Sequence, residues 1–117
     1  MNLPDCPIEL TARLVGDKWK LLILRELMCE TKRFGELKKA LGTISQKVLT
    51  SQLRDMEANG LIIRTVYAEV PPRIEYSLTE IGQSLKPVLD AMLHWGLEYK
   101  KAFAERKTHS NVETQTI

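Results

Sequence analysis

Long apolar runs and paired cysteines are missing from this sequence, and each absence removes a class of protein. The longest uninterrupted aliphatic run, residues 21–24, is far shorter than the roughly 20 apolar residues that cross a bilayer. No basic stretch leads into an apolar one near the start, so we expect no signal peptide. Cys6 and Cys29 are too few for a disulfide framework and have no partners at zinc-site spacing. We therefore expect a cytoplasmic protein with reduced thiols and no contact with membranes.

Catalytic signatures are absent as well. The sequence has no glycine-rich phosphate loop, no metal-ligand cluster and no convincing Ser/His/Asp or Cys/His set. We expect no enzyme, no catalytic or metal-binding residues and no cofactor. The composition, 44% hydrophobic and 27% charged over 117 residues, is that of one globular domain.

The net charge of +2 conceals an uneven distribution. Residues 1–17 carry a net charge of −2, residues 18–73 carry +5 and residues 74–117 carry −1. The middle segment is therefore the candidate anion-binding surface, although a solvated charged face would show the same excess.

Capping residues and glycines divide the first half of the chain into helices. Proline is favoured at the first helical position, Asp and Ser are favoured N-caps, and glycine commonly ends a helix. The predicted helices begin at Pro7, at Lys18 after the N-cap Asp17, after the basic turn Lys32-Arg33, and after the N-cap Ser45; they end before Gly16, near Cys29, at Gly42 and near Asn59.

The turn that joins the last two of these helices is so short that they form a helix-turn-helix unit. Residues 61–68 and 73–78 then read as two antiparallel strands, and the two prolines between them predict a stiff, protruding tip. Thr79 caps a final helix from Glu80 to about Arg106, with a kink or break at Pro87. We expect a flexible polar tail over residues 108–117.

The helix after Ser45 has the residues that major-groove recognition requires. Leu49, Leu53 and Met56 fall on one face of this helix, and polar residues occupy the opposite face. Arg and Lys pair with guanine or phosphate, Ser and Thr adapt to either, and Gln can read adenine. Any surface helix has a polar side, so this pattern alone is weak evidence. The predicted DNA-contacting residues on this helix are Ser45, Gln46, Lys47, Thr50, Ser51 and Arg54.

Three further cations complete the predicted DNA-contacting set. Arg73 lies at the end of the hairpin, where it can reach a minor groove or a phosphate, or can be an ordinary exposed arginine. Arg64 and Lys38 are candidates for phosphate contacts or for simple solubility.

The order of these segments resembles the HxlR-type group of bacterial winged-helix regulators, relatives of the MarR type. The resemblance covers roughly residues 6–103, and the run from Glu69 to Thr79, EVPPRIEYSLT, is its most specific part. It implies a mainly α fold with a small β-hairpin, a winged helix-turn-helix with N- and C-terminal dimerisation helices, over residues 6–107. The implied function is transcriptional regulation, with repression favoured, by a homodimer on a palindromic duplex operator.

The final helix independently permits a dimer, because it carries more apolar residues than one small core needs. The predicted interface comprises Leu85, Leu89, Met92, Leu93, Trp95 and Tyr99. A ligand cage that includes Trp19 is a less favoured interpretation of the aromatic residues, and any small-molecule effector is unidentified.

Cys6 is the candidate redox-sensing residue, since relatives within the resemblance use a cysteine before this proline to sense oxidants or electrophiles. A helix N-terminus favours the thiolate, whereas the neighbouring Asp5 and Glu9 oppose it. An inert capping cysteine is the alternative. For the whole protein, the alternative is a winged-helix module that binds proteins and not DNA.

Overall fold

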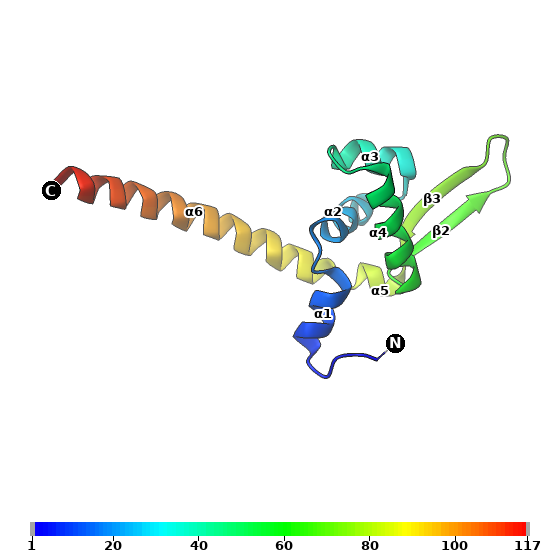
Figure 1. Ribbon diagram of the computed structural model, residues 1–117, viewed down its shortest axis with the longest axis horizontal. Helices are drawn as coiled ribbons and strands as arrows, with labels where there is room; N and C mark the ends of the chain where they lie inside the picture. The colour runs from blue at the N-terminus through cyan, green and yellow to red at the C-terminus, as the bar shows by residue number, and fades with distance from the viewer. Residues whose placement is uncertain (1, 117) are drawn as a thin grey trace. The chain divides into compact units, whose positions relative to one another are not determined.

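The computed structural model describes the backbone of residues 2–116 and the side chains of residues 2–106. Contacts divide the chain into two compact units, residues 1–86 and residues 87–117. The elements follow the order α1 (Pro7–Val15), α2 (Lys18–Cys29), β1 (Lys32–Arg33), α3 (Phe34–Leu41), α4 (Gln46–Ala58), β2 (Ile62–Tyr67), β3 (Arg73–Leu78), α5 (Glu80–Gln83) and α6 (Lys86–Thr116). The predicted helix-turn-helix and the hairpin are confirmed, and Figure 1 labels the elements of residues 1–86 except the two-residue strand β1.

Local chemistry accounts for most helix boundaries. The Asp17 carboxylate accepts hydrogen bonds from the backbone N–H groups of Trp19 and Lys20 and so starts α2. Gly42 ends α3 with a φ of 67°, a conformation that glycine adopts without steric cost. The Ser45 hydroxyl accepts from the Val48 N–H at 3.1 Å and starts α4.

The core of the first unit is apolar and lies where α2, α3 and α4 meet. α2 contacts α3, α4 and β3, and α4 also contacts β2. The largest fully buried side chains are Ile23, Leu24, Leu37, Leu49, Leu53 and Met56. α4 is therefore anchored by one face, which leaves the opposite face available for binding.

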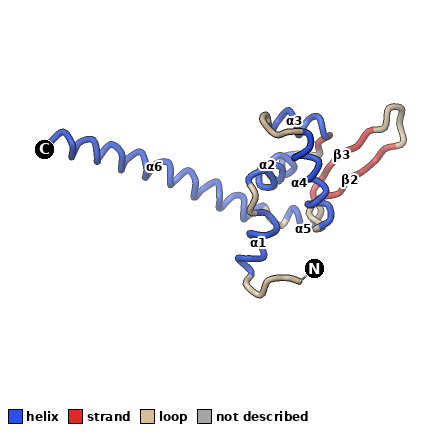
Figure 2. Tube along the Cα trace, in the orientation of Figure 1, coloured by secondary structure: helices blue, strands red, loops and turns tan. Residues whose placement is uncertain are grey.

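The sheet has one strand more than the sequence indicated. Lys32 and Arg33, expected to form a basic turn, instead make β1, which pairs antiparallel with β3 opposite Tyr76 and Glu75. The strand order is β1-β3-β2, and Figure 2 shows β2 and β3 side by side in red. Two charged residues carry little strand propensity, so only the free edge of β3 decides this pairing. The β2–β3 hairpin with its loop 68–72, called the wing below, extends past the helices of this unit (Figure 1).

The predicted break near Pro87 is confirmed. α5 ends at Gln83 and α6 begins at Lys86, which places Pro87 in the first turn of α6, where a missing N–H costs little. α6 continues to Thr116, beyond the end expected near Arg106. The predicted tail 108–117 thus belongs to a helix by its backbone up to Thr116, and its side chains lie outside the described residues. The domain limits 6–107 stay a prediction. No helix in the described part of the chain has the length and apolarity to cross a membrane.

Candidate nucleic-acid interface

The outward face of α4, called the reading face below, gathers most of the predicted DNA-contacting residues. Leu49, Leu53 and Met56 bury the opposite face. Thr50 is half-buried and its neighbours on this face are exposed. A shallow hollow of about 630 Å³ is lined by the five residues of the reading face, Gln46, Lys47, Thr50, Ser51 and Arg54. Their convergence means that one ligand surface can contact all five at once.

A second hollow, called the arginine groove below, adjoins the reading face and has a volume of about 360 Å³. It is lined by Phe34, Thr50, Leu53, Arg54, Glu57, Arg64 and Tyr76. Arg64 on β2 lies directly opposite Tyr76 on β3, so both side chains are on one face of the sheet. Two arginines against one glutamate leave the groove with a net positive charge, which suits an anion. The two hollows together contain six of the nine predicted DNA-contacting residues.

The three remaining residues lie around these hollows. Ser45 is the N-cap of α4, where Oγ accepts one hydrogen bond and the hydroxyl can still donate to a ligand. Lys38 is half-buried on α3. Arg73 begins β3 at the far end of the wing.

Two contacts from α2 hold α4 in place, and sequence reasoning missed both. The Gln52 side-chain amide donates to Asp17 Oδ1 at 3.2 Å, and Lys20 forms an ion pair with Asp55. Asp17 and Gln52 are 35 positions apart, so no local pattern signals their contact. These contacts connect the start of α2 to the helix that carries the reading face.

The family of the chain follows from a sequence comparison. The family model described as HxlR-like helix-turn-helix matches residues 14–104. The chain belongs to the HxlR-like helix-turn-helix family. The resemblance inferred from the sequence is thus confirmed.

Named relatives of this HxlR-like chain are transcriptional regulators. It is 45% identical over 115 residues to the uncharacterized HTH-type transcriptional regulator YdeP of Bacillus subtilis, covering 95% of this chain and 90% of YdeP. Among solved structures, the redox regulator HypR in its reduced form superimposes with a TM-score of 0.81 at 39% identity, over 86% of this chain and 99% of HypR. Diamide-treated YodB from B. subtilis superimposes with a TM-score of 0.69 at 37% identity, over 80% of this chain and 94% of YodB. The predicted winged helix-turn-helix fold is therefore confirmed.

Arg73 of this HxlR-like chain is enclosed by its own wing. Its guanidinium carbon lies 4.1 Å from the ring centroid of Tyr67. Nη2 is 3.5 Å from Glu69 Oε1, and Nε is 3.5 Å from Glu75 Oε1. The sequence showed Arg73 as an available cation, whereas two carboxylates surround it in the structure. The alternation of β3, which puts Arg73 and Glu75 on one face, was the available signal.

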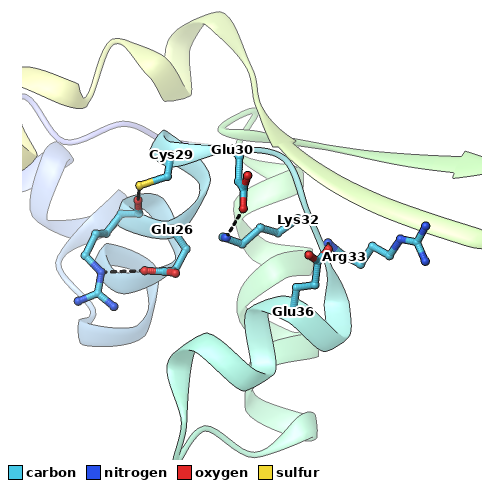
Figure 3. Close-up of polar contacts among 7 residues, drawn as sticks. Glu26, Cys29, Glu30, Lys32, Arg33 and Glu36 are labelled. Atoms are coloured by element: carbon cyan, nitrogen blue, oxygen red, sulfur yellow. Dashed lines mark hydrogen bonds and ion pairs between the residues drawn. The ribbon is translucent and has the colours of Figure 1, made fainter.

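Polar contacts at the end of α2 and in β1 are made with nearby residues, as Figure 3 shows, whereas the Arg33 guanidinium points away from them. Lys32 Nζ donates to Glu30 Oε1 at 3.0 Å, and this hydrogen bond, helped by nearby carboxylates, raises the pKa of Lys32 above its ordinary value. The Arg33 N–H donates to Glu36 Oε1 at 2.9 Å. Lys32 is therefore part of a structural ion pair with Glu30. The cations of residues 18–73 that are placed to bind an anion are those of the reading face and the arginine groove.

α6 carries an exposed apolar face. Trp95 stacks on Tyr99 with ring centroids 5.3 Å apart, and Tyr99 stacks on Phe103 at 6.1 Å. A hollow beside this aromatic row is lined by Pro87, Val88, Ala91, Met92 and Trp95. Of the predicted interface residues, Met92, Leu93, Trp95 and Tyr99 are exposed, and Leu85 and Leu89 are half-buried. Exposed aromatic side chains in a row are typical of a surface that a partner covers.

Cys6 is the N-cap of α1 and its thiol is exposed. No hydrogen bond from its side chain caps the helix, and Pro7 follows at the first helical position. Cys29 is also free and exposed, with Sγ 3.6 Å from the Arg25 carbonyl oxygen in the preceding turn. Both thiols can reach solvent, but only Cys6 lies at a helix N-terminus. Among the described residues, no group of three or more His, Cys, Asp or Glu is placed to hold a metal ion.

Proposed function

We propose that this chain is a cytosolic, dimeric, sequence-specific DNA-binding regulator, a repressor, that acts by binding and not by catalysis. The reading face carries the proposal: it exposes four polar side chains and a half-buried threonine on a helix that a fully buried apolar face and two α2 contacts hold rigidly. Membership of a family of transcriptional regulators supports it.

The geometry suggests how a duplex is bound. α4 enters the major groove and presents Gln46, Lys47 and Ser51 to the base edges. The DNA strand that separates the major groove from the neighbouring minor groove then passes between α4 and the wing. Arg54 and Arg64 line this passage as the arginine groove, so they bind its phosphates. Lys38 and the Ser45 hydroxyl add phosphate contacts at the flanks, and Arg73 contacts the DNA from the wing.

Dimerisation places two such surfaces on one operator. The aromatic row of α6 supplies the main contact, together with Leu85, Leu89, Met92 and Leu93. A two-fold dimer reads the same sequence on both halves, so the operator is palindromic, with half-sites one or more helical turns apart.

The first prediction concerns Arg54. Replacing Arg54 with alanine should weaken operator binding by about 10- to 100-fold and lower the slope of log affinity against log salt by about one, because one phosphate-binding cation leaves the interface. The measurement is fluorescence anisotropy on a duplex selected from a random pool, at several salt concentrations. The matched control is Arg25→Ala, which removes an exposed arginine from α2.

Two results would count against this proposal. If Arg54→Ala binds as the unaltered chain does, the reading face is not the contact surface. If the unaltered chain selects no duplex from the pool, the protein-binding alternative replaces the regulator.

The second prediction concerns regulation through Cys6. The exposed thiol at the start of α1 and the similarity to the redox regulator HypR and to diamide-treated YodB favour a thiol-responsive regulator. Diamide takes two electrons and two protons from two thiols, which join as a disulfide. We expect diamide to weaken operator binding by the unaltered chain and by Cys29→Ser, but not by Cys6→Ser.

Anisotropy with and without diamide measures this response, and reversal by a dithiol confirms a disulfide. Mass spectrometry identifies the second sulfur as that of Cys6 in another protomer or of a small thiol, the two partners that remain in Cys29→Ser. A Cys6→Ser protein that still responds fully to diamide would remove Cys6 from the proposal.

A further inference from the structure

The wing holds Arg73, one of its two arginines, between two different carboxylates. Tyr67 pairs with Arg73 and Thr65 with Glu75 in the β2–β3 register, so Tyr67, Arg73 and Glu75 lie on one face of the hairpin. The Arg73 side chain is 30% exposed. The guanidinium is therefore positioned by stacking on Tyr67 before any ligand arrives.

Neither ion pair of Arg73 is tight. Both N···O distances are 3.5 Å, longer than the roughly 2.7–2.9 Å of charge-assisted hydrogen bonds. Nε of Arg73 is buried and makes no hydrogen bond. Arg73 is thus electrostatically neutralised while part of its hydrogen-bonding capacity is unused, so a phosphate oxygen at normal hydrogen-bond distance would bind it better than either carboxylate does.

The two carboxylates differ in how firmly they are held. Glu75 lies in the central strand β3, opposite Thr65 of β2 and Arg33 of β1, and its side chain is 25% exposed. Glu69 lies in the loop at the tip, and its side chain is 52% exposed. Arg73, Glu69 and Glu75 together carry a net charge of −1, and Arg33 lies opposite Glu75 and not beside Glu69. The more exposed, loop-borne carboxylate is the one that can leave.

We propose that Glu69 is a displaceable substitute for a DNA phosphate on Arg73, whereas Glu75 and Tyr67 are positioning residues that keep the guanidinium in place. This inference rests on the proposed DNA binding. On the operator, Arg73 exchanges Glu69 for a phosphate oxygen, and the released Glu69 takes up a solvent cation. The exchange weakens the wing contact, so Glu69 limits operator affinity.

The test is operator binding by Glu69→Gln and Glu75→Gln at several salt concentrations, with melting curves to verify folding. Glu69→Gln should tighten binding by about two- to fivefold and steepen the salt slope by about one, because no released carboxylate recaptures a cation. Glu75→Gln should not tighten binding, because it frees Arg73 from its anchor. Glu80→Gln, in α5, is the charge-matched control and should leave both quantities unchanged.

Arg73→Ala separates the specific exchange from a general loss of negative charge. In that background Glu69→Gln should give no gain, because no arginine remains to be released. An undiminished gain with Arg73→Ala, or equal gains from Glu69→Gln and Glu75→Gln, would overturn the inference. If the unaltered chain binds the operator and Glu69→Gln binds it equally well, the inference about Glu69 is wrong but the proposed function stands. If the unaltered chain binds no duplex, both the inference and the proposed function are wrong.

Discussion

Replacing Trp95 with alanine is expected to convert the proposed dimer to a monomer and to weaken operator binding by about a hundredfold or more. Trp95 is 67% exposed in the single chain, begins the stacked row that Tyr99 and Phe103 continue, and lines the apolar hollow of α6. Such an aromatic anchor typically contributes about 2 kcal/mol or more to an interface. Two half-sites bound by one dimer gain from effective concentration, and a monomer loses that gain.

Sedimentation velocity at several protein concentrations measures the association, and anisotropy on full and half operators measures its consequence. The matched control is Lys101→Ala, six positions along α6 and away from the aromatic row, which should remain dimeric. On a half operator, Trp95→Ala and the unaltered chain should bind alike, because each reading face is intact. Trp95→Ala that sediments as a dimer at micromolar concentration would place the interface elsewhere.

Replacing Gly82 with alanine is expected to lower the free energy of unfolding by about 1–3 kcal/mol or more. A Cβ at this position would lie 2.1 Å from the Leu61 carbonyl oxygen, and this oxygen cannot simply move. It accepts a hydrogen bond from the Thr79 N–H. The Thr79 hydroxyl accepts from the Gly82 N–H and shares its proton between the Gly60 carbonyl oxygen, at 2.6 Å, and the Leu61 carbonyl oxygen, at 3.1 Å. This contact between Leu61 and Gly82, called the corner below, joins the start of the wing to α5, so a shift of Leu61 also moves β2.

Urea denaturation followed by circular dichroism measures this loss, and the melting temperature should fall by about 5 °C for each kcal/mol. Gly35→Ala is the matched control: its Cβ would meet nothing within 4 Å, and alanine favours the helix, so stability should stay the same or rise. Equal stability of Gly82→Ala and the unaltered chain would show that this corner can relax.

Helix ends and strand faces could be predicted because each depends on a few neighbouring residues. Asp17 and Ser45 cap their helices through N–H groups two or three positions away, and alternation along β3 puts Tyr76 and Leu78, both buried, on one face of the strand. The break before α6 followed from Pro87 in the same way. In each case the interacting residues lie within one helical turn or one strand of each other, so the sequence alone indicates their contact.

Relations between distant segments could not be predicted in this way. β1 is a strand only because β3 offers it an edge, and Asp17 contacts Gln52 only because α2 and α4 dock together. The close approach at Gly82 depends on Leu61, which lies on another element. The helix and strand propensities of single residues do not predict such contacts, because they form only when packed elements bring atoms that are distant in the sequence together.

The candidate interface also has some features that depend on neighbouring residues and others that depend on contacts between distant segments. The sequence by itself determined that the helix after Ser45 has an apolar side and a polar side, because helical periodicity assigns each residue to a face. Only the tertiary structure decided that Arg54 and Arg64 share one groove and that Arg73 is neutralised by Glu69 and Glu75. The physical reason is that electrostatic interactions depend on the distances between charges, and those distances are established when the helix, the sheet and the wing pack against one another.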